Sequence, residues 1–119
     1  MFIEDVQRSK SFYENVFAEQ AVYEDDDSVA FHFENTVINF LKTGAAHGLI
    51  EPASVGAGSD GSRFQLTIEV DDVDAVCAEL ADKGVELLNG PMNREWGVRT
   101  ASFTDPDGHI WEVAAKIPE

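Results

Sequence analysis

The chain has one cysteine, no long apolar run and few basic residues, and each shortage excludes a class of protein. The single cysteine, Cys77, cannot form an internal disulfide or provide a zinc site that needs two or more thiolates. No apolar stretch approaches the roughly 18 residues that a membrane-spanning helix needs. The first ten residues carry acids where a secretory signal would carry bases. We therefore expect a cytoplasmic protein with no membrane partner.

Basic residues are strongly outnumbered by acidic ones. Eight lysines and arginines stand against 23 aspartates and glutamates, which gives a formal net charge of -15. Such a surface repels phosphate backbones, so we expect no nucleic-acid partner. It attracts small cations, although the same acidity also serves solubility alone. Both interpretations of this acidic protein stay open.

The first part of the chain shows one helical pattern between strand patterns. Apolar residues recur at helical spacing after Asp5, whose side chain can cap a helix over Val6–Phe17. A short strand is expected before this helix, at residues 2–4. Three more are expected after it, at residues 21–24, 28–33 and 36–41.

The same order of elements recurs in the second part. Residues 63–70 alternate between apolar and polar, as a half-buried strand does. Asp72 precedes an expected helix over residues 73–83, which Gly84 ends. Three further strands are expected at residues 85–88, 98–104 and 110–115, the first of them closed by Gly90 and Pro91.

This internal repeat predicts an α+β fold of two βαβββ modules in tandem, with curved mixed sheets that form a cleft. In a chain of 119 residues we expect a single domain, with the first module at residues 1–42 and the second at residues 63–119. The glycine-rich segment at residues 43–62 has no sustained period, so we expect a mobile linker that can close over the cleft. Neither module alone covers its sheet, so we expect the modules to pair within or between chains.

Three motifs resemble one known group of proteins. They are Asp-Val-x-x-Ser-x-x-Phe-Tyr at residues 5–13, Val-Asp-Asp-Val-Asp-Ala at residues 70–75, and Trp-Gly-x-Arg followed by Asp-Pro-Asp-Gly-His-x-x-Glu within residues 96–112. They are similar to motifs of the vicinal oxygen chelate superfamily. That group includes glyoxalase I, bleomycin-resistance proteins, fosfomycin-resistance transferases and extradiol dioxygenases. The resemblance implies a homodimer in which modules pair across chains, and a small-molecule ligand.

The resemblance also implies four ligand positions for a divalent metal, on the first and last strands of each module. In the second module they fall on Gln65, seven residues before Asp72, and on Glu112, which could also act as a catalytic base. In the first module one position would precede Met1 and the other falls on Asn39, a neutral amide. This set is incomplete, so no cofactor is certain, and a divalent metal (Ni, Mn, Zn or Fe) stays an alternative.

Aromatic residues are more numerous than a small sheet core requires. Large rings beside a few polar groups are typical of ligand pockets, so we place Phe33, Trp96 and Phe103 in the expected cleft, although some rings of this kind simply fill a core. The cleft is further expected to contain Asn39, Gln65 and Glu112. Arg99 is expected to neutralise Glu112 or bind an anionic ligand group, unless it forms a plain surface ion pair.

Two function hypotheses follow from these residues. The first is a protein that binds or sequesters a small, aromatic and cationic molecule, as bleomycin-resistance proteins do. The second is a metal-dependent, glyoxalase-like lyase or isomerase, or a dioxygenase, acting on vicinal oxygens with Gln65 and Glu112 as ligands. A third, plainer interpretation is a domain of this fold with a vestigial site.

Overall fold

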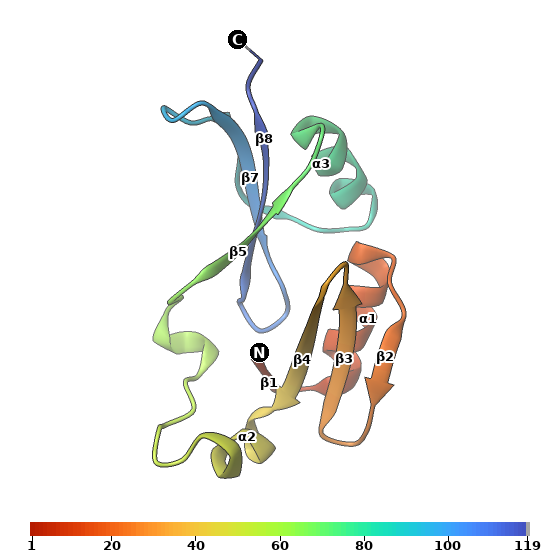
Figure 1. Ribbon diagram of the computed structural model, residues 1–119, viewed down its shortest axis with the longest axis vertical. Coiled ribbons are helices and arrows are strands. Elements are labelled where there is room, and N and C mark those ends of the chain that lie inside the picture. Colours follow the sequence, from red (N-terminus) through yellow and green to blue (C-terminus); the bar gives the residue numbers. More distant parts are fainter. Residues whose placement is uncertain (119) are drawn as a thin grey trace. The chain divides into compact units, whose positions relative to one another are not determined.

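The computed structural model describes residues 1–118 and consists of two compact units, Met1–Asp60 and Gly61–Glu119. Glu119, the end of the expected second module, lies outside the described residues. Each unit contains one four-stranded sheet (Figure 1). Within residues 1–118, no helix combines the length and apolar character needed to span a membrane.

The first unit follows the expected βαβββ order and then adds helical segments. Its elements are β1 (Phe2–Ile3), α1 (Val6–Phe17), β2 (Ala21–Glu24), β3 (Ser28–Phe33), β4 (Thr36–Lys42), α2 (Thr43–Ile50) and the short 3-10 helix η1 (Gly58–Asp60). The strand order is β1-β4-β3-β2. β1 runs parallel to β4, whereas the other neighbours are antiparallel, so the sheet is mixed as expected.

Helix α1 forms and docks through two local features. The Asp5 side chain accepts a hydrogen bond from the Arg8 backbone N–H at 3.1 Å, which caps the helix. Its buried stripe centres on Tyr13, which is fully buried with its ring 4.3 Å from that of Phe40 and 5.9 Å from that of Phe31. The aromatic cluster of this unit is therefore the core between α1 and the sheet.

The second unit repeats the arrangement. Its elements are β5 (Gln65–Glu69), α3 (Val73–Asp82), β6 (Leu87–Asn93), β7 (Val98–Thr104) and β8 (Ile110–Lys116). The strand order is β5-β8-β7-β6, with β5 parallel to β8. Asp72 caps α3 as Asp5 caps α1, by accepting a hydrogen bond from the Ala75 backbone N–H at 3.1 Å. The expected α+β fold of two βαβββ modules with mixed sheets is confirmed.

Two local expectations differ from the structure. Residues 43–50, expected within an unstructured linker, form α2, which packs on β1 and β4 with Ala46 fully buried. One small buried residue leaves no periodic apolar pattern, so the sequence gives no helical signal here.

The second difference concerns β6, which continues through Gly90 and Pro91 instead of ending before them. β6 is the outer strand of its sheet, where a proline lacking an N–H is tolerated. Gly90 has a φ of 84°, and a Cβ at this position would lie 2.5 Å from the Thr100 carbonyl oxygen. The glycine therefore permits close approach of β6 to β7 instead of breaking the strand.

Candidate functional site

The sheet of the second unit has two chemically different faces. Side chains alternate between faces along a strand, and the pairing of β7 with β8 places Ala101 with Val113 and Phe103 with Trp111. These four residues are at most 3% exposed. They share a face with Arg99, which hydrogen-bonds to Asp74 of α3, so this is the face that α3 covers. We call the opposite side the distal face.

Polar residues from all four strands form one row across the distal face. The register pairs Thr67 of β5 with Glu112 of β8, Glu112 with Ser102 of β7, and Ser102 with Asn89 of β6. Paired residues point to the same face, so the four side chains lie side by side. We call this set the central row.

Glu112 is the only ionisable member of the central row. It is half-buried, and its Oε1 atom accepts a hydrogen bond from the Thr67 hydroxyl at 3.0 Å. Ser102 is 3% exposed, and the buried Oδ1 atom of Asn89 has no hydrogen-bond partner within residues 1–118. The Oε2 atom of Glu112 and the Oδ1 atom of Asn89 are therefore acceptors open to a hydrogen-bond-donating ligand, whereas the hydroxyls of Thr67 and Ser102 can donate as well as accept.

Gln65 shares the distal face with Glu112. It lies two residues before Thr67 on β5, pairs with Ile110 and is exposed. The structure thus brings the two expected metal-ligand positions to one face of one sheet.

The donor set does not fit a divalent metal centre within this unit. Glu112 supplies one carboxylate and Gln65 one amide, whereas hard cations favour several carboxylates and softer ions favour imidazole or thiolate. Across residues 1–118, no three His, Cys, Asp or Glu side chains gather in a position to hold a metal ion. We therefore assign no chemistry that passes through a metal.

Arg99 and Phe103 lie on the α3 side of the sheet, not beside Glu112 as expected. Arg99 donates to both carboxylate oxygens of Asp74, at 2.8 and 2.9 Å, and to the Asn93 side-chain oxygen at 3.0 Å. These bonds hold the pKa of the Asp74 carboxyl below its ordinary value. Phe103 is 1% exposed and packs in the core. Arg99 therefore forms a surface ion pair, the alternative that the sequence left open, while Phe103 lies in the core instead of beside Glu112.

The two candidates of the first unit lie on opposite faces of its sheet. Phe33 points to the α1 side, with its ring 5.4 Å from that of Phe17, so it belongs to the core cluster. Asn39 precedes Phe40, which packs on α1, and therefore points to the other face, where it is exposed. Of these two residues, only Asn39 lies on the sheet face that α1 does not cover.

Trp96 lies in the turn between β6 and β7 and is 71% exposed. The Arg94 guanidinium carbon lies 5.8 Å from the centre of its ring, and Arg94 Nε donates to the Thr100 hydroxyl at 2.9 Å. The indole is therefore a surface group with a cation beside one face.

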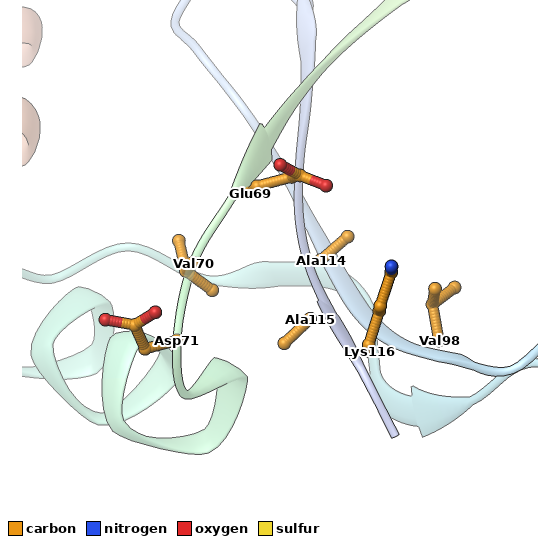
Figure 2. Close-up of a pocket in the computed structure, with 7 residues that line it drawn as sticks. All are labelled: Glu69, Val70, Asp71, Val98, Ala114, Ala115 and Lys116. Carbon is orange, nitrogen blue, oxygen red and sulfur yellow. The ribbon is translucent and has the colours of Figure 1, made fainter. Parts of the chain in front are cut away.

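A cavity of 550 Å³ lies where β5 turns into α3 and β8 continues past it (Figure 2). It is lined by Glu69, Val70, Asp71, Val98, Ala114, Ala115 and Lys116. None of these residues was expected to form a site.

The members of the central row differ in how far the sequence could reveal them. The alternation in residues 63–70 already placed Thr67 and Glu69 on one face with Gln65. Ser102 and Asn89, in contrast, come beside Glu112 only through the pairing register of the strands.

Comparisons with known proteins agree with this architecture. The sequence model of the Glyoxalase/Bleomycin resistance protein/Dioxygenase superfamily matches residues 1–113. The uncharacterized protein YraH of Bacillus subtilis is 29% identical over 117 residues, which cover 95% of this chain and 91% of YraH.

Two solved structures illustrate the similarity in fold. A glyoxalase/bleomycin resistance protein/dioxygenase from Nocardioides has a TM-score of 0.88 at 17% identity, over 98% of this chain and 80% of that one. A protein of unknown function from Agrobacterium tumefaciens has a TM-score of 0.76 at 29% identity, over 98% and 89% of the two chains.

Proposed function

Because the chain belongs to the glyoxalase/bleomycin resistance protein/dioxygenase superfamily, we propose that it binds a small cationic molecule on the distal face, with Glu112 as the anchor. The observation that carries the proposal is the central row, in which one half-buried carboxylate stands among neutral polar side chains. Thr67 occupies Oε1 of Glu112, while Oε2 has no hydrogen-bond partner within the described chain. A ligand ammonium or amidinium group can donate to that oxygen.

The charge of the whole protein supports the same ligand class. A net charge of -15 raises the local concentration of cations around the chain and lowers that of anions. The aromatic lining expected from the sequence receives less support, because Phe33 and Phe103 pack toward the helices. We therefore propose a cationic ligand without requiring that it be aromatic.

A metal-dependent lyase, isomerase or dioxygenase is the second candidate. The observation in its favour is that Gln65 and Glu112 point to the same face from neighbouring strands. Against it stands the donor set, which offers one carboxylate and one amide. On this candidate Glu112 would bind a metal instead of an ammonium group.

One experiment separates the two candidates. Phenethylammonium and its neutral alcohol analogue are titrated into the wild type and Glu112→Gln by calorimetry, with Glu79→Gln on α3 as the control for the same change of charge. Removing the charge partner of a bound cation costs about 2–5 kcal/mol. We expect Glu112→Gln to weaken the ammonium by more than about tenfold, Glu79→Gln to leave it unchanged, and the alcohol to bind more weakly than the ammonium. Equal affinities in Glu112→Gln and the wild type would refute the anchor.

The metal arm uses the same proteins. The Tm of chelator-treated wild type and of Glu112→Gln is measured by thermal denaturation, with and without added Ni²⁺, Mn²⁺, Zn²⁺ or Fe²⁺. A metal-induced rise in Tm that disappears in Glu112→Gln would favour the enzyme over the binding protein. We expect no rise of that kind.

The proposed assembly is a homodimer. β1 is only two residues long and lies at one edge of its sheet, and short edge strands leave backbone groups that another chain can pair with. Light scattering at micromolar protein checks the expected dimeric mass, and a monomeric mass would contradict it.

A further inference from the structure

The open cavity at the end of β5 lies on the distal face, next to the central row, and has the size of a small-molecule site. Its 550 Å³ falls within the roughly 300–1,000 Å³ typical of ligand pockets. Ala114 of β8 lies between Glu69 and Lys116 on the distal face, with Val98 paired to Lys116, whereas Val70 and Ala115 point to the other side of the sheet. It shares no lining residue with the central row, but Glu69 and Ala114 lie on the same face, two residues beyond Thr67 and Glu112.

Opposite charges flank this cavity without neutralising each other. Glu69 pairs with Ala114 across β5 and β8, and Lys116 lies two residues further along β8. Adjacent strands are about 4.8 Å apart and two residues of strand span about 6.7 Å, which places the Cα atoms of Glu69 and Lys116 roughly 8 Å apart. Both side chains are exposed, and neither forms an ion pair within residues 1–118.

Figure 2 shows where these groups point. The Lys116 side chain extends along the side of β8 that carries Ala114, and the Glu69 carboxylate projects from β5 beside the same residue. The Asp71 carboxylate points away from β8 and Lys116, so Glu69 is the acid that faces Ala114. On the distal face the cavity therefore has one carboxylate, one ammonium group and the small Ala114 side chain between them.

We propose that this cavity binds a small zwitterion, with the ligand ammonium at Glu69 and the ligand carboxylate at Lys116. A simple anion would meet Lys116 but be repelled by Glu69, and a simple cation would meet Glu69 but be repelled by Lys116. Only a molecule with both charges pairs with both groups, and a short methylene chain between the charges fits over Ala114. The inference does not rest on Glu112 or on the proposed function.

The test compares one zwitterion with its two halves. 4-Aminobutanoate, butanoate and butylammonium are each titrated into ¹⁵N-labelled wild type, and the backbone amide signals of Val98, Ala114 and Lys116 are followed. We expect 4-aminobutanoate to shift these signals with an affinity about tenfold higher than either single ion. Equal affinity for one of the single ions, or no shift with 4-aminobutanoate at millimolar concentration, would overturn the proposal.

Variants then assign the charges. Glu69→Gln and Lys116→Met are each expected to reduce the affinity for 4-aminobutanoate about tenfold, whereas the controls Glu79→Gln and Lys83→Met, which make the same charge changes away from the cavity, keep it. Retained affinity in either cavity variant contradicts the assignment.

Glu112→Gln makes this proposal and the proposed function distinguishable. Loss of phenethylammonium binding with 4-aminobutanoate binding retained supports two separate sites. Loss of 4-aminobutanoate binding in Glu112→Gln overturns the claim that the cavity acts on its own.

Discussion

Replacing Gly90 by alanine tests how closely β6 packs on β7 beside the candidate site. Gly90 has a φ of 84°, where a side chain costs about 1–2 kcal/mol. An added Cβ would also lie 2.5 Å from the Thr100 carbonyl oxygen and 2.8 Å from the Ala101 Cα atom. Both atoms belong to the backbone of β7, so relief requires the two strands to move apart.

The chain contains a matched control for the backbone conformation alone. Gly84, at the end of α3, has a φ of 82°, and a Cβ there would meet nothing within 4 Å. Gly84→Ala therefore carries the conformational cost without the clash. Both replacements also lower the entropy of the unfolded chain to a similar extent, so that contribution cancels in the comparison.

The expected magnitudes differ enough to measure. Gly84→Ala should lower the free energy of unfolding by about 1–2 kcal/mol. Overpacking adds about 1–3 kcal/mol, so Gly90→Ala should lower the free energy of unfolding by about 2–5 kcal/mol in total. Urea denaturation followed by circular dichroism measures both. Equal losses in the two variants, with equal m-values, would refute the reasoning that Gly90 is needed for close strand approach.

Three further predictions concern side chains. Phe103→Ala should lose about 3–5 kcal/mol of unfolding free energy, while Trp96→Ala, at a position 71% exposed, should change it by no more than about 0.5 kcal/mol; similar losses in urea denaturation would contradict the burial of Phe103. Arg99 lowers the pKa of Asp74, so their ion pair stabilises the fold above the ordinary aspartate pKa of about 3.9 and ceases to do so as the pH falls through the lower pKa of the folded state. Asp74→Asn should therefore be less stable than the wild type at neutral pH and equally stable in strong acid. Urea denaturation midpoints measured at the two pH values will test this. Burial raises the pKa of the Cys77 thiol, so a thiol reagent should react slowly with native protein and rapidly in urea, and fast native labelling would argue against a buried thiol.

The helices and the repeat could be predicted from local sequence because their causes are local. Asp5 and Asp72 each cap a helix through a backbone N–H three residues later. The apolar stripe behind each cap has helical spacing, and the alternation in residues 63–70 has the period of a strand. These short-range interactions are nearly the same in any context that lets the segment fold, so the α+β class followed from them.

The candidate site was only half predictable for a related reason. A period of two tells which residues share a face of a strand, but not which face a helix will cover. Phe33 and Phe103 were aromatic and therefore expected in a cleft, yet each lies on the side that its helix covers. Glu112 and Gln65 were placed by motif spacing and share the distal face.

Register, close approach and cavities belong to the tertiary structure alone. Ser102 and Asn89 come beside Glu112 because the consecutive strands β6, β7 and β8 pair in one particular register. Gly90 continues a strand instead of ending it because the β7 backbone lies where a side chain would be. Glu69 and Lys116, 47 positions apart in the chain, flank one cavity because β8 continues beyond the point where β5 leaves the sheet. Each depends on the distance between backbones from different segments, a quantity that no local pattern of residues specifies.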